Sequence, residues 1–407
     1  MTEGATTFDP WVPFRPERAD ADLAAIRELQ ATCPVNRQVD GNWLVTSAEG
    51  VRGVLERIDD FGGTFGDYTN IDPDDIILPG IAEPLHAVIR RGVNASVAYH
   101  RSVTVKPYLI DLVTELVGEA FAECDTHGEV DIYRVALLPV PAAVIAHLLG
   151  VPVEDRALFT RWGDELCERQ LEGENFHRPV GELHPEFAAY LDNHIATRKS
   201  EGATGEDSIS RMMRTTTQDG LPMSDRMIRT QLMNLLVAGN ETTRNLLGSM
   251  FYLLATDAEL ADRLSADRSL IPNFVEETLR LEPPVRFLVR RCSHESSLAG
   301  TSIDGGDTLL VSIEGANRDG SVTEKPDELD LHRPSPRNHL AFGAGPHICP
   351  GAFLARLEAE VVLDTFFDLV ASIALADGAE YVPHPIYWAR GPVSLTVTLS
   401  RRKADAT

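Results

Sequence analysis

The amino-acid sequence predicts a mainly α-helical protein with a smaller β portion, folded as a single domain over residues 1–407. Helical patterns dominate from Pro84 to about residue 282, whereas β-prone segments and turns alternate after residue 285. No repeat, low-complexity tract or change of composition marks a linker between two domains. Hydrophobic residues make up 43% of the chain and charged residues 24%, which is typical of a globular protein with a large core.

The N-terminal part carries clear local signals. Residues 19–33 have the apolar spacing of an amphipathic helix, and residues 34–47 read as a β-hairpin with its turn at Asp40-Gly41. Ser47 can cap a following helix that runs through Leu55. Residues 59–83 are rich in Gly, Asp and Pro. A loop of this length inside a compact fold tends to be a lid or a binding loop, so we expect it to border a site.

The longest predicted helix begins after Ser224 and is apolar through much of its length. At 1.5 Å per residue it would extend ~45 Å, so we expect it to pass through the middle of the molecule. Residues 135–153 are long and apolar enough to span a bilayer, but their prolines would break a spanning helix, and a buried core helix is predicted instead. The last helix is expected from about Pro350 to Leu369, followed by a short β-rich tail.

Charge and cysteine content narrow the class of protein. The net charge of −25 argues against a general affinity for nucleic acid. The five cysteines are scattered and form no CxxC pair, so neither a disulfide framework nor a zinc knuckle is indicated. The first residues resemble neither a signal peptide nor a membrane anchor. We therefore expect a cytoplasmic protein that does not associate with membranes.

One cysteine stands in a constrained loop, HLAFGAGPHICPG, residues 339–351. If the last helix begins at Pro350, Cys349 is its N-cap, where backbone N–H groups and the helix dipole favour the thiolate. Gly343 and Gly345 allow a tight turn and leave room for a flat ligand. A lone thiolate is a poor zinc site but can be the axial ligand of a haem iron. The alternative is a small buried apolar cysteine.

A polar group interrupts the longest predicted helix at AGNETT, residues 238–243. An acid and a hydroxyl, Glu241 and Thr242, incur a desolvation cost in an apolar helix interior. Gly239 costs roughly 1 kcal/mol relative to alanine there. A small residue beside an acid–alcohol pair leaves room for a ligand and offers a path for protons. The alternative is a helix bend in which a threonine hydroxyl bonds the preceding turn.

These motifs together resemble a known family. Phe342-x-x-Gly345-x-His347-x-Cys349-x-Gly351 resembles the haem-ligand loop of the cytochrome P-450 haem-thiolate monooxygenases, and further landmarks follow in family order across residues 86–360. The resemblance implies the cytochrome P-450 fold, with the long central helix over a buried haem b and Cys349 on the iron. It also implies that Thr242, rather than Thr243, hydrogen-bonds dioxygen and that Glu241 relays protons.

The same resemblance assigns further residues around the haem. Ala238, Gly239, Phe342, Gly343 and Gly351 would border it. The propionates would be bound by His86, Arg90, Arg290, His339 and His347, with Arg291 as an alternative to Arg290. Glu277 and Arg280 match the ExxR pair of the family, and Arg333 matches the arginine that completes it. These last three are expected to have a structural role.

The resemblance implies that one oxygen atom of O2 is inserted into a small or mid-sized hydrophobic substrate by hydroxylation, O-demethylation or epoxidation. No flavin or nicotinamide fingerprint is present, so we expect a monomer that receives electrons from a separate ferredoxin and its NAD(P)H-dependent reductase. An acidic ferredoxin would dock on a local basic patch. The residues expected in this patch are Arg90, Arg91, Arg101, Lys106, Arg337 and Arg356.

The substrate pocket is inferred by analogy and is expected to be apolar and aromatic. Its predicted residues are Phe61, Phe65, Tyr68, Leu235, Phe287, Leu288, Tyr387 and Trp388. Arg286 departs from this character and is expected either to face solvent or to bind a substrate carboxylate. Two rival functions remain, namely a peroxide-driven peroxygenase or isomerase on the same haem, and a non-catalytic haem scaffold in a biosynthetic assembly.

Overall fold

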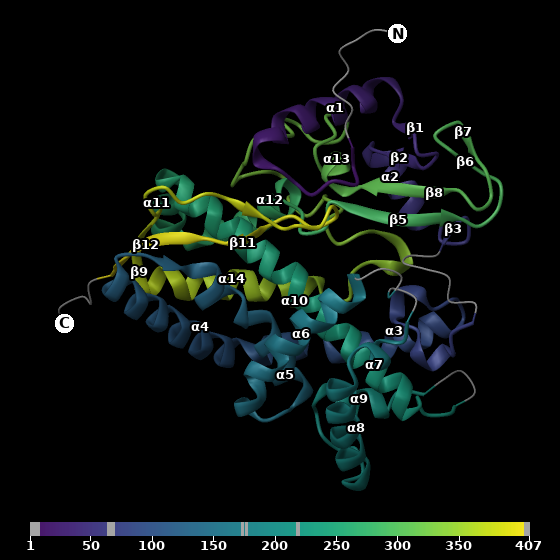
Figure 1. Ribbon diagram of the computed structural model, residues 1–407, viewed down its shortest axis with the longest axis horizontal. Helices are drawn as coiled ribbons and strands as arrows, with labels where there is room; N and C mark the ends of the chain where they lie inside the picture. The colour runs from purple at the N-terminus through teal and green to yellow at the C-terminus, as the bar shows by residue number, and fades with distance from the viewer. Residues whose placement is uncertain (1–8, 63–69, 172–174, 176–177, 217–219, 403–407) are drawn as a thin grey trace.

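The computed structural model describes residues 9–62, 70–171, 175, 178–216 and 220–402. Its longest helix, α10 (Asp225–Thr256), crosses the middle of the molecule (Figure 1). Ser224 caps this helix, because its side-chain oxygen accepts a hydrogen bond from the backbone N–H of Met227. Most side chains of α10 are buried, including several polar ones. The predicted long central helix is confirmed.

Helices account for most of the described chain and surround α10 (Figure 1). Helix α4 lies along α14, and α14 in turn contacts α10. The remaining α-helices are α1 (Ala19–Thr32), α2 (Ala48–Glu56), α3 (Leu85–Ser96), α4 (Tyr99–His127), α5 (Pro139–Leu149), α6 (Arg156–Leu171), α7 (Val180–Leu183), α8 (Pro185–Ser200), α9 (Ser208–Met213), α11 (Ala258–Ala266), α12 (Ile271–Leu281), α13 (Ile313–Asn317) and α14 (Ala352–Leu369). Short 3₁₀ turns and one π-helical turn, Tyr133–Leu137, connect them.

The β portion is built mainly on a five-stranded sheet in the order β1-β2-β8-β5-β3. Strands β2 and β8 pair in parallel, with Trp43 opposite Leu309, and the other neighbours are antiparallel. The strands of this sheet are β1 (Val35–Arg37), β2 (Trp43–Val45), β3 (Phe61–Gly62), β5 (Phe287–Cys292) and β8 (Thr308–Ser312). Strands close to the N-terminus are therefore held by strands from the last third of the chain.

Smaller sheets complete the β portion. A three-stranded sheet has the order β4-β12-β9, and two hairpins pair β6 with β7 and β10 with β11. Their bounds are β4 (Val130–Asp131), β6 (Ser296–Leu298), β7 (Thr301–Ile303), β9 (Val370–Leu375), β10 (Val382–Pro383), β11 (Pro392–Ser394) and β12 (Thr396–Arg401). The β-rich tail that the sequence predicted is thus present, and it returns to pair with a strand near residue 130.

The N-terminal predictions are confirmed. Helix α1 matches the predicted amphipathic helix, and β1 and β2 form the hairpin around Gly41, whose φ of 89° suits glycine. The side chain of Ser47 accepts a hydrogen bond from the N–H of Gly50 and so caps α2. Helix α5 confirms the predicted core helix, because it is buried along most of its length. Among the described residues, no helix is both long enough and apolar enough to cross a membrane.

The start of the last helix differs from the prediction. Helix α14 begins at Ala352, and Gly351 is its N-cap. Pro350 therefore lies before the helix, in a turn that follows the short 3₁₀ helix Gly345–His347. Cys349 is not the N-cap but stands two residues before it. The turn is closed by the Ala352 N–H, which donates to the Cys349 carbonyl at 3.4 Å.

Candidate active site

A cavity of about 380 Å³ lies between α10, strand β5, the loop before α14 and the loop around Trp388. Cys349 and Thr242 both line it, although 107 positions separate them in the sequence. Ala238 is exposed although it stands in the middle of a core helix, because its side chain borders this cavity. The cavity therefore brings together the two motifs that the sequence singled out.

Cys349 is held in the cavity wall by its own backbone. Its N–H donates to the Phe342 carbonyl at 2.9 Å, which closes the loop between the two residues. Burial raises the pKa of the Cys349 thiol, although the backbone N–H groups of Gly351 and Ala352 and the charge of Arg90 act in the opposite direction. The predicted helix-start donors are present, but in the protein alone burial outweighs them. A bound cation reverses this balance, because a coordinating thiol is deprotonated.

Two glycines shape the loop in different ways. Gly345 has a φ of 69°, and a Cβ there would lie 2.6 Å from the Leu55 carbonyl oxygen, so the loop packs directly on the end of α2. Gly343 has a φ of 74°, and a Cβ there would meet nothing within 4 Å. Gly343 lines the cavity, so the missing side chain leaves the wall beside Cys349 clear. This wall fits a flat ligand.

A group of donors and cations stands at one edge of the cavity, with fewer acidic partners within the described chain than the group has members. Arg290 is 6% exposed and donates to the Val289 carbonyl, and burial lowers its pKa to about 10. His86 bonds Glu83 through Nδ1 at 2.8 Å, but its buried Nε2 has no partner among the described residues. The His347 ring lies 4.4 Å from the His86 ring, and burial, together with nearby cations, lowers its pKa to about 4.

Arg90 completes this group. It donates to the Ile348 carbonyl and, at 3.1 Å, to Asn94. Within the described chain, Glu83 is the carboxylate that bonds a member of this group, and it bonds His86. Buried donors and cations of this kind require an anion. The two propionates of a haem, bound with its flat ring over Cys349, fit both the open wall and this edge.

Two other expected propionate ligands lie elsewhere. His339 is buried, its Nε2 bonds Glu276 at 2.9 Å and its Nδ1 accepts from the N–H of Ala341 at 3.2 Å, so neither nitrogen is free for a propionate. This expectation is corrected. Arg291 is exposed because side chains alternate across β5, whereas Arg290 faces the cavity. Of the two arginines, Arg290 is therefore the one placed to bind a propionate.

Glu241 and Thr242 lie on α10 opposite the cysteine loop. The Thr242 hydroxyl donates to the Ala238 carbonyl at 2.8 Å, so the back-bond considered as an alternative from the sequence does occur, within a side chain that also lines the cavity. A Cβ on Gly239 would lie 3.3 Å from Ile145, which makes glycine the residue that fits against α5. The alcohol and the small residue thus stand where a ligand over Cys349 would meet α10.

Glu241 is buried and heavily bonded. It accepts hydrogen bonds from Arg244, from Asn245 at 3.1 Å and from His384 Nε2 at 2.6 Å. Burial alone would raise the pKa of Glu241, but the His384 hydrogen bond and the Arg244 charge outweigh it and lower the pKa to about 2. Arg244 is in turn paired with Asp164. The carboxylate is therefore anchored as well as placed at the cavity.

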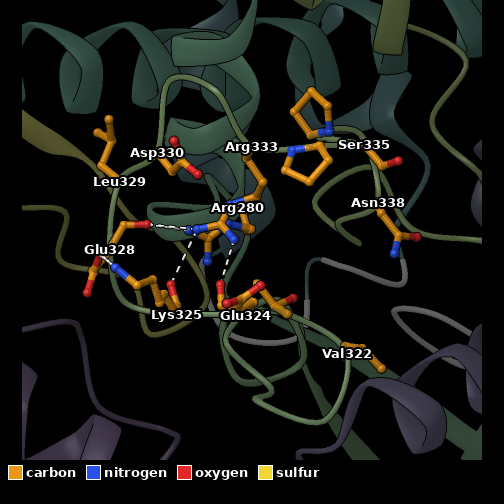
Figure 2. Close-up of a pocket in the computed structure, with 13 residues that line it drawn as sticks. Arg280, Val322, Glu324, Lys325, Glu328, Leu329, Asp330, Arg333, Ser335 and Asn338 are labelled. Atoms are coloured by element: carbon orange, nitrogen blue, oxygen red, sulfur yellow. Dashed lines mark hydrogen bonds and ion pairs between the residues drawn. The ribbon is translucent and has the colours of Figure 1, made fainter.

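The predicted structural triad is assembled. Glu277 bonds Arg280 at 2.7 and 2.8 Å and Arg333 at 2.9 Å, and all three residues are buried. Figure 2 shows the two arginines at the edge of a groove of about 600 Å³, with Arg280 reaching the surrounding loop. Their other N–H groups donate to backbone carbonyls of residues 317–328. The triad therefore fixes the loop between α13 and the cysteine segment.

The expected substrate residues divide into three groups. Leu235, Phe287, Leu288, Tyr387 and Trp388 line the cavity. Phe61 does not, because it is fully buried in the core of the β portion with Arg57 over its ring at 5.0 Å, and this expectation is corrected. Phe65 and Tyr68 lie outside the described residues, as do the side chain of Arg101 and all of residues 63–69.

Arg286 follows neither alternative that the sequence left open. It is 2% exposed and forms a two-point ion pair with Glu314 at 2.8 and 2.9 Å. Its guanidinium also donates to the Tyr387 carbonyl at 3.2 Å. Arg286 therefore faces neither solvent nor a substrate. It joins the end of the five-stranded sheet to the loop that carries Trp388.

Several cavity residues were missed by sequence reasoning. Gln170 and Asn234 line the cavity with no side-chain hydrogen bond recorded within the described chain, and Cys167 lies 3.8 Å from Glu241. Glu358 is buried with one carboxylate oxygen unpaired, and burial raises its pKa well above the usual range. A signal for Glu358 exists, because it falls on the apolar stripe of α14 with Leu354.

The class of protein follows from this geometry. Cys349 below an open wall, an anion-binding edge and an acid–alcohol pair across the cavity define a site for a flat, dianionic, thiolate-ligated cofactor. A family model described as cytochrome P450 matches residues 173–368. The chain is 30% identical over 384 residues to a steroid C26-monooxygenase of Mycobacterium tuberculosis, covering 93% of each chain. The chain belongs to the cytochrome P450 family.

Further relatives agree with this assignment. The chain is 33% identical to the cytochrome P450 monooxygenase PikC of Streptomyces venezuelae, over 78% of this chain and 74% of the relative. The crystal structure of CYP109E1 from Bacillus megaterium in complex with corticosterone matches with a TM-score of 0.82 and 29% identity, covering 94% of this chain and 99% of that one. The protein is a cytochrome P450 monooxygenase, and the cofactor of its family is haem b.

Proposed function

We propose that this monooxygenase inserts one oxygen atom of O2 into a mid-sized hydrophobic substrate, with electrons supplied by a separate ferredoxin and its NAD(P)H-dependent reductase. The observation that carries the proposal is the shared cavity, because the cysteine and the acid–alcohol pair open onto one apolar space of about 380 Å³. The acid–alcohol pair favours dioxygen over peroxide as the oxidant. It also favours an oxygenase over an isomerase or a haem scaffold. We further propose that residues 1–407 act as one unit and as a monomer.

The residues present would hold haem b in a defined way. The Cys349 thiolate would ligate the iron, and Phe342, Gly343 and Gly351 would form the wall below the ring, with Ala238 and Gly239 above it. The propionates would take Arg90, Arg290, His347 and His86 as partners. When bound, haem supplies the binding and reduction of dioxygen.

The remaining chemistry belongs to the protein. We propose that the Thr242 hydroxyl exchanges its bond to the Ala238 carbonyl for one directed into the cavity, where it donates to oxygen. Glu241 precedes it on the same helix and would pass protons toward it. The apolar side chains of Leu235, Phe287 and Leu288 exclude water and position the substrate.

We propose that the substrate is a rigid polycyclic molecule of steroid type with one polar group. Two relatives are named for such substrates, the steroid C26-monooxygenase and a vitamin D(3) 25-hydroxylase of Pseudonocardia autotrophica, which is 32% identical over 79% of this chain and 77% of the relative. Asn234 and Gln170 supply polar groups in the cavity wall. Asn234 precedes Thr242 by eight helical residues, about 12 Å along the axis, which leaves room for such a ring system.

Two spectral measurements test this function. Dithionite-reduced holoprotein with carbon monoxide should give the red-shifted band for which the family is named. Corticosterone should shift the iron spin state, and Asn234→Leu should weaken its binding about fivefold to thirtyfold, since a lost hydrogen bond is worth about 1–2 kcal/mol. Leu253→Met on the far half of α10 serves as the control. A normal carbon monoxide band without any response to steroids would contradict the substrate class alone.

The ferredoxin would dock on the face behind Cys349. Lys106 and Arg91 are exposed there, and the side chain of Arg337 is 70% exposed, whereas Arg90 and Arg356 turn inward to Ile348 and Glu276. Lys106, Arg337 and Arg356 all act on the carboxyl of Glu360, so these cations gather around one point of α14. Ile348, whose carbonyl accepts from Arg90, is also exposed. A small basic surface with an apolar centre suits an acidic iron–sulfur protein.

Charge reversal tests this surface. Lys106→Glu combined with Arg91→Glu should slow reduction by an acidic ferredoxin roughly tenfold at low salt, because steering depends on the local field, and the difference should shrink at high salt. Arg263→Glu plus Lys199→Glu changes the net charge equally on exposed positions of α11 and α8. Stopped-flow reduction measures both. Equal slowing by the control pair would show that only net charge matters.

A further inference from the structure

The anchored acid Glu241 has one partner that does not belong to α10. His384, in the loop after β10, places Nε2 at 2.6 Å from Glu241 Oε1. Its backbone N–H donates to the Gly391 carbonyl at 3.0 Å, which fixes this loop against the strand that follows. The contact joins the C-terminal loop to the middle of the central helix.

The second nitrogen of the His384 ring is buried on a residue that lines a surface groove. Its Nδ1 is buried and has no hydrogen-bond partner within the described chain, and the whole residue is 7% exposed. His384 also lines a surface groove of about 650 Å³, whose walls include Arg15, Glu17, Tyr252 and Tyr381. One nitrogen of the ring therefore bonds the acid of the active site. The other is buried and unpaired within the described chain, and a water that enters from the groove would satisfy it.

Glu241 by itself is poorly suited to carry protons inward. Its carboxylate is bonded by Arg244, Asn245 and His384 and has its pKa lowered to about 2, so it stays ionised at neutral pH. The other charged or titratable groups around it are Asp164 and Cys167 on α6, Tyr133, and Arg15, Glu17 and Glu380 in the groove. Among these groups and His384, the His384 imidazole is the group with two ring nitrogens, one of which bonds Glu241 while the other does not.

We propose that His384 is a proton relay that connects this groove to Glu241 and, through it, to Thr242. A water that enters from the groove gives a proton to Nδ1 while the Nε2 proton passes to Oε1 of Glu241, which hands it on to the Thr242 hydroxyl. The ring is neutral before and after the transfer and resets by turning over, which exchanges its two nitrogens. The relay rests on the proposed oxygenase function of the site, and His384 acts through Glu241.

The test compares His384→Gln with a histidine remote from the site. Glutamine can still donate to Glu241 but cannot carry a proton, and His127→Gln changes an exposed residue at the end of α4. Holoenzyme is supplied with spinach ferredoxin, its reductase and NADPH, without substrate, and dioxygen consumption is followed in H2O and D2O. We expect His384→Gln to slow consumption at least tenfold and to change its solvent isotope effect, because positioned proton transfer contributes about 10²–10⁴-fold.

A second readout does not depend on turnover. In ¹⁵N-histidine-labelled protein, the resonances lost in His384→Gln identify this ring, and its ring-nitrogen chemical shifts should change in Glu241→Gln because the carboxylate that bonds Nε2 is gone. Unchanged consumption and isotope effect in His384→Gln, or ring-nitrogen shifts unmoved by Glu241→Gln, would overturn the relay. Absence of the red-shifted carbon monoxide band in wild-type holoprotein would instead contradict the oxygenase function and leave the ring-nitrogen shifts interpretable.

Discussion

At the scale of single residues, several buried carboxylates have arginine partners, whereas donors at the cavity edge lack such pairing. Glu277, Glu314 and Glu276 each bond an arginine, whereas Arg290 and His86 retain unsatisfied positive or donor groups within the described chain. Because an unpaired buried cation is costly, Arg290 and His86 mark a place where an anion is expected.

Cys349→Ser should remove the thiolate without disturbing the loop. The hydrogen bond from the N–H of residue 349 to the Phe342 carbonyl does not involve the side chain. The free energy of unfolding of the apoprotein should therefore stay within about 0.5 kcal/mol of wild type. The reduced carbon monoxide complex should lose its red-shifted band, and oxygenase activity should be abolished. Absorption spectra and thermal melts measure the two effects. A retained red-shifted band would remove Cys349 from the iron.

Glu277→Ala should destabilise the protein strongly. It leaves Arg280 and Arg333 buried without their carboxylate, and breaking a buried ion pair in this way costs about 3–5 kcal/mol. Glu259→Ala, at an exposed position in α11, should change the free energy of unfolding by about 0.5 kcal/mol or less. Urea unfolding of both variants provides the comparison. Similar losses in the two variants would show that the triad has no special structural role.

At the scale of elements, the cysteine loop is positioned by backbone contacts with α2 as much as by its own sequence. Gly345→Ala places a methyl group 2.6 Å from the Leu55 carbonyl oxygen and adopts a positive φ, so it should cost more than about 2 kcal/mol and lower haem content. Gly378→Ala has a similar φ of 76° but open space around it, and should cost about 1 kcal/mol. Thermal melts and haem-to-protein ratios of the two variants test whether the contact with the Leu55 carbonyl destabilises the protein more than the positive φ alone.

Local elements were the part most accessible from the sequence. Helix α1, the hairpin around Gly41 and the cap of α10 follow from apolar spacing, turn residues and a serine at the right place. The start of α14 was placed too early because the residues before it form a 3₁₀ helix and a turn, which a proline does not distinguish from a helix start.

Long-range pairings explain what the sequence could not give. Arg286 looked like a surface or substrate residue because its partner, Glu314, lies on a different element. His339 resembled a propionate ligand until Glu276 occupied it, and Phe61 pairs into a sheet rather than into the pocket. His384 carried no motif at all, and its link to Glu241 exists only because the C-terminal loop packs on α10. Side-chain partners distant in sequence leave no local pattern.

At the scale of the whole molecule, buried carboxylates set the response to acid. Burial would raise the pKa of Glu276, but His339 and Arg356 prevail and lower it to about 2, and Glu241 behaves in the same way. Because these folded-state values lie below the ordinary value of 4.5, the two groups stabilise the fold above about pH 4.5, and this stabilisation is lost as the pH falls toward 2.

Acid unfolding should therefore become less steep in Glu276→Gln. The variant should be less stable at pH 7, because Arg356 and Arg337 lose their acid. Its free energy of unfolding should nevertheless change less between pH 5 and pH 3, because a carboxyl with a depressed pKa has been removed. Glu259→Gln is the matched control on an exposed site. Urea unfolding across this range measures the slope, and an unchanged slope in Glu276→Gln would contradict the assignment.

The parallel pairing of β2 with β8 also determines when the five-stranded sheet can form during synthesis. Trp43 lies opposite Leu309, so strand β2 must await a partner 266 residues downstream. At about 5–20 residues per second, the ribosome needs roughly 13–53 s to supply it. Throughout that time the N-terminal hairpin presents an unpaired edge. Yield in a host cell should therefore depend on chaperones and on growth temperature more than the final stability of the fold would suggest.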